Sequence, residues 1–227
     1  MRIRFFKFRL EYGKASVLLL VLVFLFMKAE GQSETDRLQV EEFWQEFHIH
    51  RDIGQKLGSA LIFNNFYRTG YGFYDWFVQG KLAYQLNAWF EMEALYRHES
   101  YSLGEQRVQE YRPMLRAVMK KKIGLWSLRN RHRLEYRMFK VGESHFRYRT
   151  DVKIKPRINW TSWKLNPYVT EELFFSHQQY GRNRIYTGVE GKKGKTEPGA
   201  YVAMQSDKGI NSWEHRLIVG IVLGLEL

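Results

Sequence analysis

The sequence predicts an all-β protein, an antiparallel transmembrane β-barrel of about 10–12 strands. Three observations predict it. Polar and apolar residues alternate over long segments, the turns expected between them are short on one side of the sheet, and tryptophans gather near the segment ends. Together these features are typical of outer-membrane barrels, which have an apolar lipid face and a polar lumen.

The composition narrows the class of protein. The chain has 227 residues, 36 Lys and Arg against 24 Asp and Glu, and no cysteine. This length favours one folded domain. The absence of cysteine excludes disulfides, thiolate metal sites and thiol nucleophiles, and we expect no cofactor and no metal site.

The N-terminal segment has the pattern of a secretory signal peptide. Residues 1–14 are rich in basic side chains, and residues 15–27 form the uncharged run ASVLLLVLVFLFM before KAEGQ. This run is shorter than the roughly 20 apolar residues that a membrane-spanning helix needs. We therefore expect residues 1–31 to be cleaved, leaving residues 32–227 as the barrel.

The stretch LRNRHRLEYR, residues 128–137, carries the clearest strand signal. In a helix its arginines would scatter around the axis. In a strand, Arg129, Arg131 and Arg133 share one face, and Leu128 and Leu134 share the other. The alternation therefore predicts a strand with one charged and one apolar face.

The same test predicts the other strands along the chain. It gives eleven segments, at 38–51, 57–68, 74–86, 88–98, 107–120, 123–139, 144–157, 166–177, 183–191, 198–206 and 212–227. Pro113 interrupts the fifth of these, where a backbone donor is lost. Because bacterial single-chain barrels have even strand numbers, we expect the count of eleven to be wrong by one, with the doubtful segment near the N-terminus.

Five short motifs resemble an outer-membrane family of unknown function, DUF2490. Its members share an E-x-R strand, an R-x-R-x-E-x-R strand, an R-x-R strand, an acidic residue before a Phe, and an R-x-Y-x-G strand. The matching residues are Glu110 and Arg112; Arg131, Arg133, Glu135 and Arg137; Arg147 and Arg149; Glu172; and Arg184, Tyr186 and Gly188. The resemblance implies an outer-membrane barrel and no assigned activity.

The charged face is the candidate functional site. Its residues are Glu110, Arg112, Arg116, Arg129, Arg131, Arg133, Glu135, Arg137, Arg147, Arg149, Asp151, Glu172 and Arg184. Glu110, Glu135, Asp151 and Glu172 are the natural counterions, because an unpaired buried charge is costly. Two functions stay open: a structural plug of salt bridges, and a narrow pore or binding site for a small anionic solute, which the surplus of arginine would favour.

Other functions compete with this interpretation. A lipid hydrolase would need a hydroxyl next to a histidine base, and Ser144 with His177 is the pair that two neighbouring strands could bring together. A soluble exported β-sandwich would also alternate. A nucleic-acid surface is disfavoured, because the arginines and aromatics lie on opposite faces. As partners we expect outer-membrane lipid, the barrel-assembly machinery and a small anionic solute.

Overall fold

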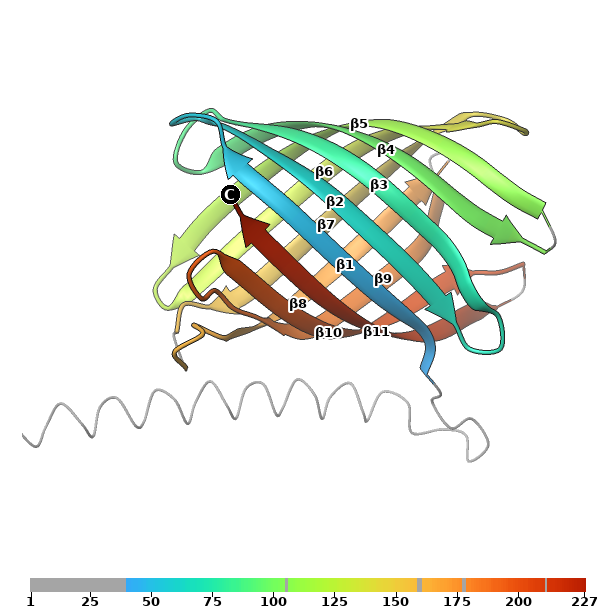
Figure 1. Cartoon of the computed structure of the whole chain (residues 1–227). Helices are drawn as coiled ribbons and strands as arrows, with labels where there is room; N and C mark the ends of the chain where they lie inside the picture. Colours follow the sequence, from blue (N-terminus) through green and yellow to red (C-terminus); the bar gives the residue numbers. More distant parts are fainter. Residues whose placement is uncertain (1–39, 105, 159–160, 177–178, 211) are drawn as a thin grey trace, which may run out of the picture. The chain divides into compact units, whose positions relative to one another are not determined.

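The described residues form a closed β-barrel (Figure 1). The computed structural model describes residues 40–104, 106–158, 161–176, 179–210 and 212–227. The predicted signal peptide therefore lies outside the described residues. No helix in the described part of the chain is long and apolar enough to cross a membrane.

Eleven strands make up the wall of the barrel. They are β1 (Val40–Asp52), β2 (Leu57–Arg68), β3 (Gly72–Gln85), β4 (Phe90–Leu103), β5 (Gln106–Ile123), β6 (Trp126–Phe139), β7 (His145–Pro156), β8 (Asn166–Ser176), β9 (Gln179–Glu190), β10 (Thr196–Lys208) and β11 (Trp213–Glu226). Each predicted segment corresponds to one of these strands. The predicted fold class is confirmed, and the soluble β-sandwich is wrong, because the sheet closes on itself.

The expected even strand number is wrong. β1 pairs with β11 in parallel, with Trp44 opposite Gly220 and Phe47 opposite Leu223, whereas all other neighbours are antiparallel. In an up-and-down sheet with an odd number of strands, the first and last strands run the same way. A parallel ladder also satisfies the backbone groups, so closure does not require an even count.

The expected difference between the two ends of the barrel is also wrong. At the end away from the C-terminus, β2 ends at Arg68 and β3 begins at Gly72, and β4 ends at Leu103 just before β5 begins at Gln106. The segment TGYGFY, residues 69–74, was expected to form a longer loop there, but its residues from Gly72 onwards belong to β3. The longest connection, from Pro156 to Asn166, lies at the C-terminal rim, the same side as the turns DIGQK and KKKIG that the sequence predicts to be short.

Pro113 perturbs β5 without ending it. Pro113 stays opposite Tyr96 of β4, but the ladder between β5 and β6 skips from Tyr111 to Met114. Because proline has no N–H to donate, the gap falls on the side of the strand where that donor would be needed.

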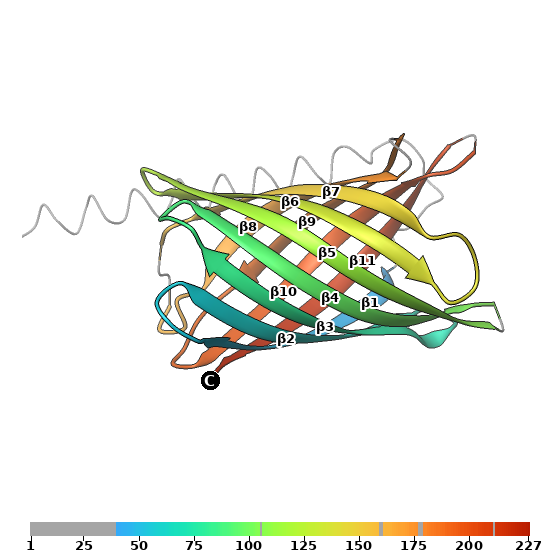
Figure 2. The same ribbon diagram turned by 90° about the horizontal axis from the view of Figure 1, so that it is seen from above.

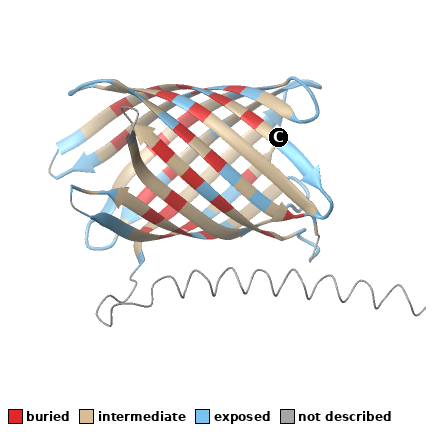
Figure 3. Cartoon of the chain, turned by 180° about the vertical axis from the view of Figure 1, so that it is seen from behind, coloured by how far each residue is buried: buried red, intermediate tan, exposed pale blue. Residues whose placement is uncertain are grey.

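The predicted alternation of faces is visible along the strands (Figure 3). On β6, Arg133 and Glu135 are buried, and Leu134 between them is 47% exposed on the outside of the barrel. On β11, buried Ile218 faces inward while Ile221 and Leu223 are exposed. The apolar faces therefore form the outer wall, and the polar faces meet in the lumen.

One part of the lumen is filled by aromatic and aliphatic side chains. Trp44, Phe66, Phe77, Tyr201, Ala203 and Ile218 form a buried cluster from β1, β2, β3, β10 and β11. The Tyr201 ring lies against Gly220, at a distance that leaves no room for a Cβ atom. The charged residues of β4–β9 occupy the facing part of the lumen, so this cluster limits the space beside them.

Candidate functional site in the barrel lumen

The structure brings all thirteen residues of the predicted charged face to the lumen. Most of them line an internal cavity of about 1470 Å³. Glu110, Glu135 and Asp151 lie behind the arginines and are almost fully buried. The view from above in Figure 2 shows β5, β6 and β7 side by side in one wall, and these three strands supply most of the set.

Glu110 is the centre of a first network of ion pairs. Its carboxylate lies 2.7 Å from the guanidinium groups of Arg112 and Arg137. Arg112 also contacts Glu99 at 3.0 Å, and Glu99 contacts Arg97 at 3.1 Å. The predicted pairing of Glu110 with Arg112 is present, and the two neighbours from β4 extend it.

Glu135 is the centre of a second network. Its oxygens contact Arg147 at 2.6 Å, Arg149 at 3.2 Å and Arg133 at 3.3 Å. The carboxylate has no exposed surface. One buried carboxylate thus holds three guanidinium groups, because the register of β6 and β7 places Glu135 opposite Arg147.

Glu172 continues this network onto β8 and β9. It accepts hydrogen bonds from Arg149 and lies 3.5 Å from Arg184. Arg184 also donates to Gln205 on β10. The guanidinium groups of Arg149 and Arg184 lie 4.3 and 5.1 Å from the ring centre of the buried Phe174. Cation–π contact with this ring favours the charge of both arginines.

Towards the C-terminal rim, positive charge exceeds negative charge. Asp151 contacts Arg131 at 2.7 Å and Arg129 at 3.6 Å. Arg116 pairs with Glu93 of β4. These three arginines line the cavity beside two carboxylates.

Two arginines of β6 keep unused donors. The Nε atoms of Arg129 and Arg133 are buried and have no hydrogen-bond partner among the described residues. A buried N–H without an acceptor costs free energy. An anion in the adjacent cavity would supply a countercharge to both guanidinium groups.

Several lumen residues were missed by the sequence reasoning. Glu93 and Arg97 lie in the expected strand 88–98, but no motif connected that strand to the arginines. Glu99 was missed because the predicted strand stopped at residue 98, whereas β4 runs to Leu103. Glu42, which contacts Arg68 at 2.8 Å, lies in the N-terminal part that the alternation described least clearly.

The proposed catalytic pair stays a prediction. Ser144 is exposed in the connection between β6 and β7. His177 lies outside the described residues.

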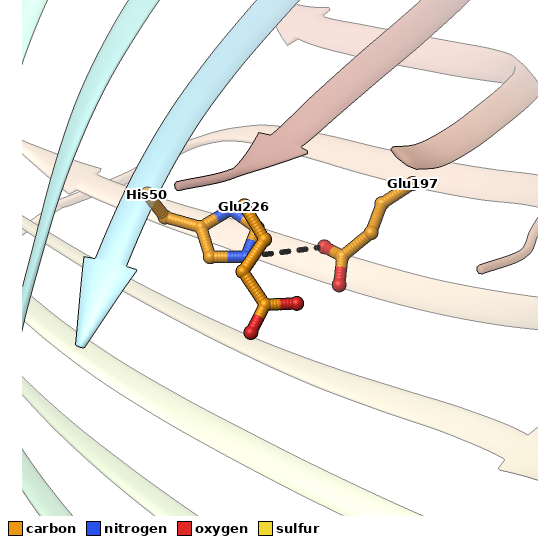
Figure 4. Close-up of side chains that lie close together, drawn as sticks. All are labelled: His50, Glu197 and Glu226. Atoms are coloured by element: carbon orange, nitrogen blue, oxygen red, sulfur yellow. Dashed lines mark ion pairs between the residues drawn. The ribbon is translucent and has the colours of Figure 1, made fainter. Parts of the chain in front are cut away.

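A His and two Glu side chains gather at the C-terminal rim (Figure 4). Ligand atoms of His50, Glu197 and Glu226 lie within 4.8 Å of one another. The Lys192 ammonium contacts Glu226 at 2.6 Å and Glu197 at 3.0 Å. These hydrogen bonds raise the pKa of Lys192. The cluster thus already holds a cation of its own, which neutralises the carboxylates that a metal would use.

The closed sheet, the apolar outer wall and the charged lumen define an outer-membrane-type β-barrel. Residues 41–196 match the family described as a protein of unknown function, DUF2490, and the chain belongs to this family. The resemblance predicted from the strand motifs is confirmed, and the family's description assigns no activity.

A solved structure is also similar to this chain. The beta domain of the Bordetella autotransporter BrkA shares 14% sequence identity, with a TM-score of 0.48, over 71% of this chain and 78% of that one. No curated protein matches the chain.

Proposed function

We propose that this barrel lies in the bacterial outer membrane and that its lumen binds and admits a small anionic solute. The observation that carries the proposal is the set of arginines beside the cavity, where Arg129 and Arg133 keep unpaired donors. Fixed positive charge in a confined lumen favours anions over cations. The planar guanidinium group also suits oxyanions, since it can donate two parallel hydrogen bonds.

The cavity extends towards both rims of the barrel, as the entry of a solute requires. Its lining includes Lys56 and Lys155 near the C-terminal rim and Arg68 and Leu103 near the opposite rim. The networks around Glu110 and Glu135 narrow the lumen between these ends. This arrangement supports slow, selective passage or retention in preference to a wide water-filled channel.

Ion selectivity in planar bilayers tests the proposal. We expect the purified protein to give a reversal potential of anion-selective sign in a potassium chloride gradient. The double substitution Arg129→Gln and Arg131→Gln should move this potential towards zero. Lys208→Gln is the matched control, because it removes a positive charge from the exposed end of β10, outside the cavity lining.

Binding is measured separately by titrating the refolded chain with inorganic phosphate. Heat of binding that disappears in the double variant would support a retained anion even without conductance. Cation selectivity would contradict the proposal. So would the absence of both conductance and binding, which would leave the charges as a structural plug.

Export by a cleaved signal peptide at residues 1–31 belongs to the same proposal. Its support is the basic, apolar and small-residue pattern of that segment. N-terminal sequencing of the protein from outer-membrane fractions should begin at Gln32. Recovery of the uncleaved chain, or of the protein from the inner membrane, would contradict it.

A further inference from the structure

The outer wall carries one charged residue at a position where a lipid face is normally apolar. Glu171 is exposed and is the central residue of β8, and it lies opposite the outward-facing Val152 and Ile185. On the outward faces of the described strands, the other Asp, Glu, Lys and Arg residues lie within three residues of a strand end. Charges on the lipid face are most costly near the middle of the bilayer.

Few polar groups of its own chain stabilise the Glu171 carboxylate on this face. Asn183 of β9 donates to it at 3.3 Å. Among the described residues, no Lys, Arg or His nitrogen forms an ion pair with this carboxylate. A carboxylate with one amide partner is therefore left facing outward at mid-strand.

A donor lies on the same outer face, two strands away. His132 is central in β6 and faces outward beside Thr150 of β7. Its Nδ1 is hydrogen-bonded to the Tyr148 hydroxyl. In the tautomer whose Nδ1 accepts from that hydroxyl, the ring N–H lies on Nε2 and can donate to a partner.

We propose that the outer face of β6–β9 is the contact surface for a second copy of this chain in the membrane. In a two-fold symmetric contact, residue i of one copy meets residue j of the other, and the reverse pair forms as well. An axis that passes beside Val152 on β7 would set each His132 against the Glu171 of the other copy. Both residues lie near the middle of their strands, so the pairs form at one depth.

Charge complementarity within the surface favours a second copy, and not lipid, as the group that contacts it. Acyl chains offer Glu171 no donor. Anionic headgroups would be repelled by its carboxylate, and they lie at the level of the strand ends. A second copy supplies a histidine donor at the required depth and buries both polar groups.

The absence of native cysteine allows a direct test by disulfide crosslinking. Val152→Cys places a thiol beside the proposed axis, and Leu61→Cys is the matched control on β2, with the same 40% exposure of the native side chain. Each full-length variant is refolded into phosphatidylcholine vesicles at low protein density and oxidised. We expect covalent dimers from Val152→Cys and essentially none from Leu61→Cys.

The carboxylate is then tested in the Val152→Cys background. Adding Glu171→Gln should weaken dimerisation by about tenfold or more, because both symmetry-related hydrogen bonds lose the charge on their acceptor. Circular dichroism checks that the variant keeps its β-sheet. Equal crosslinking at the two cysteines, or yields unchanged by Glu171→Gln, would overturn the proposal.

The inference rests on the membrane placement proposed above, and vesicle flotation separates the two. Protein that floats with the vesicles but stays monomeric overturns the dimer alone. Protein that does not float overturns the membrane placement and the dimer together. Anion selectivity of the lumen does not depend on the dimer, but it does require insertion into the membrane.

Discussion

Removing the charge of Glu135 should be among the most damaging small changes in this barrel. Glu135→Gln keeps the shape of the side chain, but its amide group would face guanidinium donors. Arg133 and Arg147 have no other carboxylate within 4 Å among the described residues, and their side chains are only 8% and 11% exposed. Arg149 keeps Glu172.

The expected magnitude follows from the burial of these charges. Breaking a buried ion pair by removing one partner costs about 3–5 kcal/mol, because the remaining charge is left desolvated. Here two arginines lose their carboxylate together, so the upper part of that range applies. Arg147→Met added to Glu135→Gln should recover part of the lost stability, since it removes one of the two arginines that no longer have a carboxylate partner.

Urea unfolding of the barrel in phosphatidylcholine vesicles, followed by tryptophan fluorescence, measures the change. Glu91→Gln is the control, because Glu91 pairs with Lys120, whose side chain is 44% exposed. Such a pair contributes at most about 1 kcal/mol. A loss below about 1 kcal/mol for Glu135→Gln would refute the reasoning, because it would mean that lumen water already solvates the arginines.

Two further predictions concern the two faces of the wall. Gly220→Ala should destabilise the barrel by about 1–3 kcal/mol, because its Cβ would overlap the Tyr201 ring. Gly80 has open space around it, so Gly80→Ala should have little effect in the same unfolding assay. Leu134→Arg should cost about 2–4 kcal/mol at mid-membrane, against about 0–1 kcal/mol for Ile123→Arg at the end of β5. Equal unfolding free energies within either pair would contradict the packing of Tyr201 or the membrane depth of β6, respectively.

The faces of the strands could be predicted from the sequence because side-chain direction in a strand is a local property. Successive residues point to opposite sides, so alternation in residues 128–137 is enough to separate Arg133 from Leu134. The structure keeps this separation in β6. The strand ends were predicted less well. β4 extends to Leu103 because it pairs with β5 there, and no local pattern in the sequence indicates that pairing.

Ion-pair partners could be predicted only as a group. The sequence identified the acids Glu110, Glu135, Asp151 and Glu172 as counterions, and each does contact arginine. Which arginine each acid contacts depends on the register between strands. A shift of two residues would keep every face and exchange every partner.

The sequence by itself determined that this protein is a barrel with an apolar outside and a charged inside. Successive side chains of a strand point to opposite faces, so the alternation of polar and apolar residues assigns each residue to its face. Only the tertiary structure decided the closure, with β1 parallel to β11 in an eleven-stranded sheet. It also decided that Arg129 and Arg133 keep unused donors beside a cavity, and that Glu171 and His132 share the outer wall. These features depend on register and curvature, which arise from contacts between residues far apart in the chain.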